Sequence, residues 1–143
     1  MKVTLLLADS AQAVDGKLYV LGGGWSIIGP EPSPIAIAMK IEVPWDQANR
    51  RHLWQLELLD ADGNPVSATG PEGDAEPIEI SGEFEVGRPP GLKPGTPLDL
   101  PLAITMSPLP LPPGARYVWR LSIDGASHED WQLAFSTRPP REG

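Results

Sequence analysis

The sequence predicts an all-β fold, a two-sheet antiparallel β-sandwich of about eight or nine strands with at most one short helical turn. Two observations predict it. Several short stretches alternate between apolar and polar residues, as in residues 116–123 (RYVWRLSI) and 35–43 (IAIAMKIEV). A period of two places one set of side chains on a buried face of a strand and the other toward solvent. Turn-forming Pro, Gly and Asp-Gly separate these stretches, and the totals of 18 Pro and 15 Gly argue against long helices.

The first half of the chain contains four predicted strands, over residues 2–8, 17–21, 35–43 and 54–58. The first is apolar at nearly every position, which is typical of a strand covered on both faces. Asp15-Gly16 predicts the tight turn between the first two strands. Between the third and the fourth, Asp46 is expected to cap one helical turn over residues 47–49.

The second half contains a tight turn at 60–64 (DADGN) and a short return strand around Val66. Further strands are predicted over 78–86, 98–106 and 116–123, followed by a last strand with Trp131, Leu133 and Phe135 facing inward. Residues 69–77 are rich in Gly, Pro and acidic side chains and are expected to form a loop. Pro101 lacks a backbone donor, so its strand should start late or lie at a sheet edge. Residues 1–137 are expected to form one domain, with 138–143 as a flexible tail.

Two resemblances refine this prediction. The segment 111–117 (LPPGARY) resembles the tyrosine corner of immunoglobulin-like domains, in which a tyrosine at the start of the penultimate strand hydrogen-bonds back to the preceding connection. The whole chain, with the blocks LADSAQAVDGKLYVLGGGWSI and LPPGARYVWRLSIDG, resembles an uncharacterised family of small bacterial proteins of unknown function. The resemblance implies a compact immunoglobulin-like β-domain and brings no catalytic residues with it.

Composition restricts the function. A formal net charge of −8 opposes binding to nucleic-acid phosphates, which requires clustered Lys and Arg. The absence of Cys excludes disulfides, thiolate metal sites and a Cys nucleophile, and it fits a reducing compartment. The apolar run over residues 3–8 is too short for a secretory signal, and no stretch is long enough to span a membrane. We therefore expect a cytoplasmic protein that binds neither nucleic acid nor membranes.

No motif predicts catalysis or a cofactor. A dinucleotide motif starting at Gly22 would need Gly where Ile27 stands, and a nucleophile elbow around Ser26 has the wrong spacing. The two histidines, His52 and His128, exclude a three-histidine metal site, and both are expected at the surface. Ser127, His128 and Asp130 are too close in sequence to align as a triad. We therefore predict no enzyme, no metal and no cofactor.

An acidic segment lies between Arg51 and Arg88, with nine carboxylates and no Lys or Arg. A docking face for a basic partner and a weak cation site are two interpretations. A solvated strand face and loop that discourage edge pairing is the preferred one.

The tryptophans indicate where a partner could bind. Trp54, Trp119 and Trp131 have the same alternation as the apolar residues of their strands, which places them in the core. Trp25 and Trp45 fall in connections, where an exposed aromatic can anchor a partner or stack on a sugar. Arg50-Arg51, just beyond Trp45, is an adjacent basic pair, so the predicted partner-binding residues are Trp25, Trp45, Arg50 and Arg51. We expect a non-enzymatic module that binds an unidentified protein or has a structural role. A small-ligand or carbohydrate-binding sandwich is the alternative, and an open sheet edge also allows a homodimer.

Overall fold

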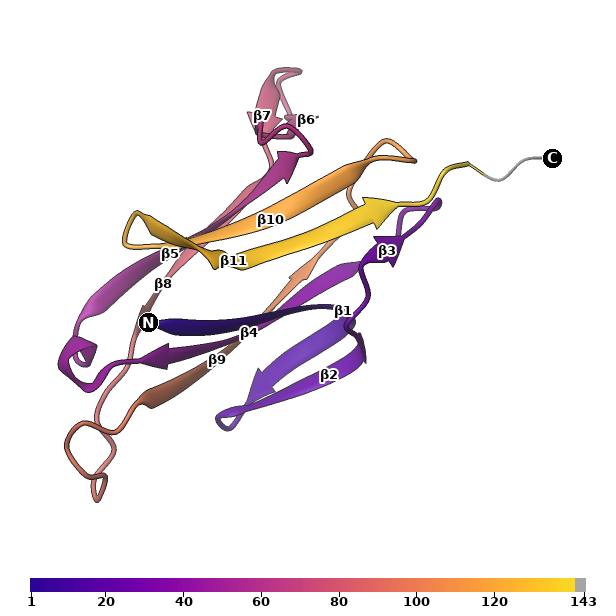
Figure 1. Cartoon of the computed structure of the whole chain (residues 1–143). Coiled ribbons are helices and arrows are strands. Elements are labelled where there is room, and N and C mark those ends of the chain that lie inside the picture. Colours follow the sequence, from indigo (N-terminus) through magenta and orange to yellow (C-terminus); the bar gives the residue numbers. More distant parts are fainter. Residues whose placement is uncertain (141–143) are drawn as a thin grey trace.

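A computed structural model of the chain describes residues 1–140 and shows an all-β protein with one short 3₁₀ turn (Figure 1). The elements are β1 (Lys2–Val14), β2 (Lys17–Gly23), β3 (Ile27–Ile28), β4 (Ile35–Val43), η1 (Trp45–Gln47), β5 (Arg51–Asp60), β6 (Ser67–Thr69), β7 (Ala75–Pro77), β8 (Glu79–Glu85), β9 (Leu98–Met106), β10 (Arg116–Ile123) and β11 (Ala126–Thr137). All the strands expected from alternation are present, and β1, β2 and β5 are longer than predicted because backbone pairing continues beyond the apolar positions.

The strands form two main sheets. One has the order β2-β1-β4-β9, and the other has the order β3-β11-β10-β5-β8. Every pairing in them is antiparallel except the short parallel contact between β3 and β11. The predicted turn at Asp15-Gly16 is confirmed, with both residues at positive φ. Pro101 lies in β9, which is an edge strand as expected.

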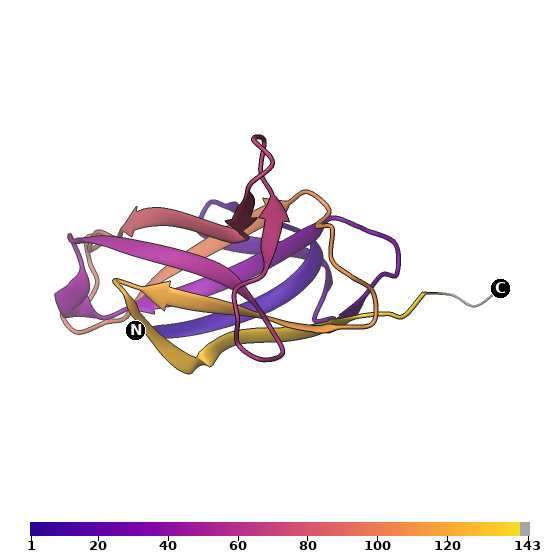
Figure 2. The same ribbon diagram turned by 90° about the horizontal axis from the view of Figure 1, so that it is seen from above.

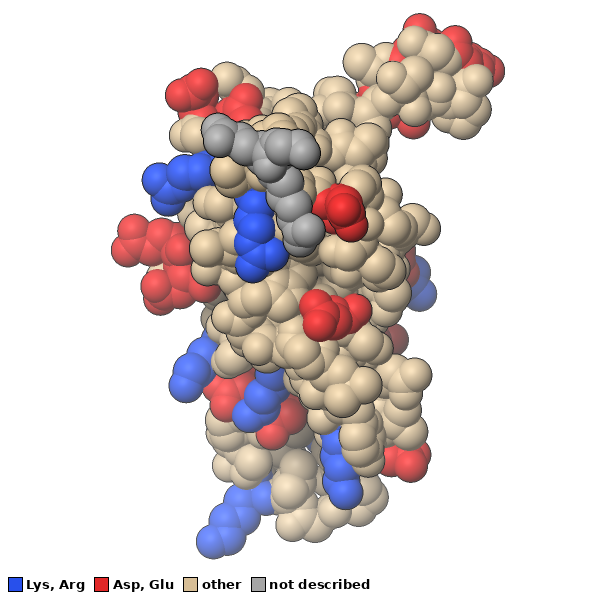
Figure 3. All heavy atoms as spheres, turned by 90° about the vertical axis from the view of Figure 1, so that its right-hand side faces the viewer, with Lys and Arg blue, Asp and Glu red and all other residues tan. Residues whose placement is uncertain are grey.

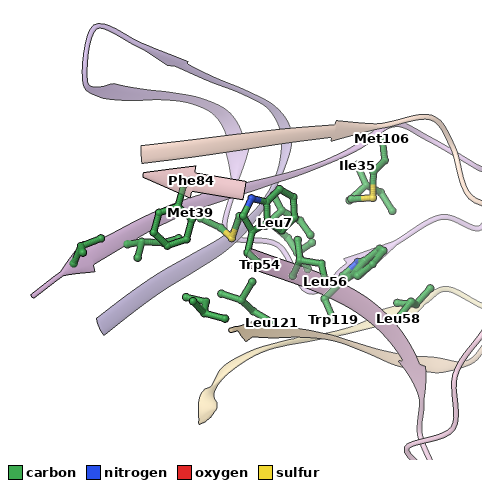
Figure 4. Packing of buried hydrophobic residues seen from close by; sticks show 14 of the residues in the cluster. Leu7, Ile35, Met39, Trp54, Leu56, Leu58, Phe84, Met106, Trp119 and Leu121 are labelled. Carbon is green, nitrogen blue, oxygen red and sulfur yellow. The ribbon is translucent and has the colours of Figure 1, made fainter. Parts of the chain in front are cut away.

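The hydrophobic core lies between these two sheets, and the alternating residues of both point into it (Figure 4). Leu7, Ile37 and Met39 come from the four-stranded sheet, and Leu56 and Trp119 from the five-stranded sheet; each is at most 2% exposed. Trp54 is also buried, and Trp131 packs against the core at its margin. The three tryptophans that parity assigned to the core therefore all contact it.

The four-stranded sheet is covered on its outer face as well. β1 is longer than predicted and bends, so that its second half and β2 lie across the far side of β4 (Figure 1). A second buried cluster forms there, in which Leu18 and Val20 of β2 pack on Ala36 and Ala38. The end of the first predicted strand, residues 6–8, is therefore covered on both faces, whereas Lys2 and Thr4 at its beginning are exposed.

Part of the segment 69–77 is not the loop that its composition predicted. Residues 70–74 form a turn, but Thr69 and residues 75–77 belong to the β6–β7 hairpin, which projects from the body of the molecule in two perpendicular views (Figures 1 and 2). A turn with hydrogen bonds from Gly70 and Gly73 closes the hairpin, and acidic side chains gather on this arm (Figure 3). The expectation of a loop was wrong because three-residue strands are too short to show a period.

The helical turn also differs from its prediction. It begins one residue after Pro44 and covers Trp45–Gln47 rather than 47–49, and no side chain caps it. Asp46 therefore lies inside the turn and is not its cap. Pro44 stands directly before the turn, and its carbonyl oxygen accepts the hydrogen bond from the Gln47 backbone.

The connection before β10 makes the hydrogen bond that a tyrosine corner makes. The hydroxyl of Tyr117 donates to the carbonyl oxygen of Pro112 at 3.4 Å, and the Thr137 hydroxyl donates to the same oxygen at 2.8 Å. After β11, Arg138 is hydrogen-bonded through its backbone to Ile28 and through its side chain to Gly29. Residues 141–143 of the predicted tail lie outside the described residues.

Candidate functional site

The two candidate tryptophans lie at different ends of the molecule. Trp45 belongs to η1, directly after β4, whereas Trp25 lies just before β3, which precedes β4 (Figure 1). The nine residues of β4 separate them, about 27 Å at the usual rise per residue. One small ligand therefore cannot contact both rings. Trp25 is half-buried and packs edge-on against Phe135, with 6.3 Å between the ring centroids.

Trp45 is fixed by a residue that is distant in the sequence. The guanidinium of Arg88 lies over the Trp45 ring, 4.8 Å from its centroid, and both Nε and a terminal nitrogen donate to the Trp45 carbonyl oxygen, at 3.2 and 2.7 Å. Arg88 follows β8, so this contact ties the β8–β9 connection to η1. The combination of a cation–π contact and two hydrogen bonds restricts both the ring and the backbone of the turn.

A groove of about 560 Å³ opens beside this tryptophan. We call it the η1 groove; it is lined by Met1, Lys2, Glu42, Pro44, Trp45, Asp46, Gly95 and Pro97. Its apolar residues come from three separate parts of the chain: the N-terminus, Pro44 with η1, and the end of the β8–β9 connection. Only the folded structure brings them together.

The charges at the rim of the η1 groove are partly compensated. Lys2 and Lys40 both lie within 4 Å of the Glu42 carboxylate, and Lys40 also approaches Asp99. Asp46 is exposed beside Trp45. The groove therefore combines an apolar floor with a rim of both signs, which does not favour a strongly charged ligand.

His52 supports the same end of the molecule from within. It is 2% exposed, so the expectation of a surface histidine was wrong. Its Nδ1 lies 2.7 Å from Oδ2 of Asp124 in the β10–β11 turn, its Nε2 lies 2.9 Å from the Gln47 carbonyl oxygen of η1, and its ring stacks on Phe84. His52 therefore connects η1 to the β10–β11 turn.

Burial and hydrogen bonding act on the His52 pKa in opposite directions. Burial lowers it, but the hydrogen bonds to Asp124 and Gln47 outweigh burial and raise the pKa above its usual 6.5. The pKa of Asp124 is lowered from 3.8 because its carboxylate accepts hydrogen bonds from His52 and from the Leu53 backbone. Both shifts favour the charged pair.

The predicted basic pair is divided between two places. Arg51 forms an ion pair with Glu83 on β8, at 3.4 Å, on the outer face of the five-stranded sheet. Arg50 is exposed, and its positive charge lies near enough to His52 to oppose part of the rise in the pKa of that ring. The cation that contacts Trp45 is Arg88 instead of either of them.

A second hollow, about 630 Å³, lies on the outer face of the five-stranded sheet. The polar side chains along it are largely paired with one another: Arg120 with Glu57, and Gln55 with Glu79. The acidic segment is thus partly compensated by arginines from other strands. Because these groups already have partners, the η1 groove is the stronger candidate site.

Three other kinds of site find little support in residues 1–140: a metal site, a catalytic triad and a membrane-spanning helix. Within that range there is no cluster of three or more His, Asp or Glu side chains that could hold a metal ion. Ser127 donates to the Leu121 carbonyl oxygen, and His128 accepts from the Asp130 backbone, so the three neighbours do not align as a triad. No helix in the same range is long and apolar enough to cross a bilayer.

Sequence reasoning identified Trp45 but missed the groove around it. Arg88 stands in a proline-rich connection that predicts only a rigid linker, and Pro97 stands at the end of the same connection. His52 carries a weak signal, because it has the parity of Trp54 and Leu56 on the inward face of β5. That parity could have predicted its burial.

Comparison with known proteins gives one match. A family model described as "Family of unknown function (DUF6941)" matches residues 3–136. The comparison with curated proteins found no match, and the comparison with solved structures found none either.

Proposed function

The chain belongs to this family of unknown function, and we propose that it is a non-enzymatic module that binds an extended segment of a partner protein in the η1 groove. One observation carries the proposal: the groove contains an aromatic ring that Arg88 already fixes from a distant part of the chain. A side chain that is ordered before binding loses little entropy when a partner packs against it. Tryptophan is also among the residues that contribute most to protein interfaces.

We also propose that the fold is an immunoglobulin-like sandwich. On this proposal β1, β4 and β9 correspond to strands A, B and E of such domains, and β5, β10 and β11 correspond to C, F and G; the strand orders of the two sheets support it. The bond from Tyr117 to Pro112 supports the same assignment. On this assignment η1 lies in the B–C connection and Asp124 in the F–G turn, at the end with which variable domains bind their antigens.

The groove favours a partner segment with apolar side chains and little net charge. Its floor offers Pro44, Trp45 and Pro97. The ion pair of Lys2 with Glu42 leaves Asp46 as the uncompensated charge among the lining side chains. A segment in extended or polyproline II conformation fits a surface of Trp and Pro, because it enters the groove with little conformational entropy left to lose.

The proposal is tested by affinity purification of the tagged protein from its native cell. Four baits are compared: the natural chain, Trp45→Ala, Asp46→Arg and Asp62→Arg. Trp45→Ala removes the groove's aromatic floor, and Asp46→Arg reverses the charge at its rim. Asp62→Arg makes the same charge change in the β5–β6 turn and is the matched control. Circular dichroism and thermal unfolding establish that all four baits are folded.

We expect the natural chain and Asp62→Arg to recover the same protein, and the two groove variants to recover it at least about tenfold less, as for the loss of 1.4 kcal/mol or more. Equal recovery by all four baits would place the contact elsewhere. Recovery of nothing by any of them would contradict a protein-binding role and favour small-ligand screening by tryptophan fluorescence.

A further inference from the structure

The four terminal strands of the two main sheets differ in how they are protected against pairing. β8 carries Glu79, Glu83 and Glu85 on its outer face, β9 contains Pro101, and β3 has only two residues. Charges, prolines and short length are the usual means by which edge strands avoid pairing with another chain. β2 has seven residues, no proline and a single charge at its first position. It is therefore the least protected of the four edges.

Beyond Lys17, the exposed side chains of β2 are apolar. Leu21 is 72% exposed and Tyr19 55% exposed, and Val14, at the end of the paired strand β1, is 46% exposed. Through Leu18 and Val20, the other face of β2 packs on the second buried cluster, the alanine cluster of Ala8, Ala11, Ala36 and Ala38. The strand is therefore held in place without a partner. An ordered, apolar edge is the kind that accepts another strand.

The pairing of β2 with β1 determines which of its backbone groups are free. A two-residue turn makes Val14 and Lys17 a hydrogen-bonded pair, and the pattern alternates from there, so that Tyr19 and Leu21 also bond to β1. The N–H and C=O groups of Leu18 and Val20 consequently point away from β1. They lie along the open edge of the sheet.

We propose that two copies of this chain pair antiparallel through β2, with Val20 opposite Val20 of the second copy. This register joins the free backbone groups of the two strands to each other, and it uses the full length of β2. It also places Tyr19 opposite Leu21 of the second copy, twice, as an aromatic–aliphatic cross-strand pair. A twofold axis through Val20 makes the contact closed, so it forms a dimer and not a fibre.

Charge favours the antiparallel direction. Lys17 stands at one end of β2, and the Asp9 carboxylate lies against Gly22 near the other end, within 2.2 Å of where a Cβ would stand. Antiparallel pairing brings the Lys17 end of each copy toward the Asp9 end of the other, whereas parallel pairing brings like charges together. The net charge of −8 opposes association, but salt screens its long-range part.

The main test is a charge exchange measured by sedimentation or light scattering of the full chain over about 5–500 µM, the range expected for an interface smaller than a standard one. One variant carries Tyr19→Lys with Leu21→Lys, and the other carries Tyr19→Glu with Leu21→Glu. In the proposed register each variant faces its own charges, so each alone is expected to be monomeric. An equimolar mixture of the two is expected to form a heterodimer. Leu53→Lys changes a comparably exposed leucine on the other sheet and should leave the natural dimer unchanged.

The absence of cysteine in the natural chain allows a test of register. Directly opposite residues that are not hydrogen-bonded to each other have Cα atoms about 4.5 Å apart, which a disulfide can bridge. A mixture of Tyr19→Cys and Leu21→Cys should therefore form a disulfide-linked heterodimer under mild oxidation, faster than either variant alone.

A natural chain that stays monomeric throughout the concentration range would overturn the proposal. So would a dimer that both charge variants retain, or a mixture that fails to associate. The inference does not rest on the proposed function, because β2 contributes no residue to the η1 groove. Dimer loss and partner loss are therefore separate results.

Discussion

Nδ1 of His52 lies 2.7 Å from Oδ2 of Asp124, across 72 residues of sequence, and this contact joins the start of β5 to the β10–β11 turn. The second ring nitrogen faces the Gln47 carbonyl oxygen, which can only accept. A neutral imidazole donates from one nitrogen alone, so both contacts are hydrogen bonds only when His52 is protonated. The two contacts together favour the protonated form of the buried ring, paired with the Asp124 carboxylate.

This pair predicts how stability depends on pH. The folded pKa of His52 is raised above 6.5, so its contribution is complete below pH 6.5 and is lost as the pH rises through the folded pKa. The folded pKa of Asp124 is lowered below 3.8, so its contribution is complete above pH 3.8 and is lost as the pH falls through the folded value. The pair stabilises the protein most between these limits.

The measurement is the free energy of unfolding by urea at a series of pH values. We expect the natural chain to lose stability above pH 6.5 and Asp124→Asn to lose most of that dependence, because asparagine tolerates the positive φ of this turn but carries no charge. His128→Gln is the control: this exposed histidine accepts one backbone bond, and its replacement should leave the profile as it was. If His128→Gln, and not Asp124→Asn, removed the loss of stability above pH 6.5, the assignment would be contradicted.

A second prediction concerns Gly82 on β8. A Cβ there would stand 2.8 Å from the Trp54 ring, although the backbone has no positive φ that would itself require glycine. Gly82→Ala should destabilise the protein by about 1–3 kcal/mol, because Trp54 must move within a packed core. Ser81→Ala, on the outward face of the same strand, should change stability by less than about 0.5 kcal/mol.

The cause of the Gly82 effect is tested by a double-mutant cycle. Trp54→Phe removes the part of the ring that lies nearest to Gly82, so Gly82→Ala should cost less in its presence than in the natural chain. Strictly additive effects would show that the cost does not come from the Trp54 contact.

A third prediction compares two hydroxyls that donate to the same carbonyl oxygen of Pro112. The bond from Thr137 is 2.8 Å long, and the Thr137 oxygen also accepts from the Ala115 backbone, whereas the bond from Tyr117 is 3.4 Å long. Thr137→Val should cost about 1–3 kcal/mol because it leaves a buried backbone donor without its partner. Tyr117→Phe should cost less than about 1 kcal/mol. The reverse order in thermal unfolding would mean that the tyrosine bond dominates this connection.

Alternation predicts the strands well because it reports directly on burial. The series in 35–43 and 116–123 became β4 and β10, with their apolar parity in the core. It does not report which strands pair, and it fails for segments such as β6 and β7 that are too short to have a period. The bend in β1 was also missed, since alanine suits both a buried and an exposed position.

The candidate site was less predictable because its contacts are long-range. Trp45 could be selected as a loop aromatic, but its partner Arg88 stands 43 residues away, and the adjacent Arg50 and Arg51 were the natural choice from sequence. Turn composition made His52 a surface residue by default, although its parity within β5 favours the core. Local patterns carry no information about a groove assembled from segments that are far apart in the sequence.

The alanine cluster has an evolutionary consequence. Because Ala36 and Ala38 lie under the β1–β2 hairpin while Ile35 and Ile37 lie in the main core, no side chain in the first half of β4, residues 35–39, is free to vary in size. An ordinary strand with one solvent-exposed face tolerates substitutions of different size at every second position. Among members of this family, residues 35–39 of β4 should therefore appear as an unbroken block of restricted positions, and Ala36 and Ala38 should resist replacement as strongly as the large residues beside them.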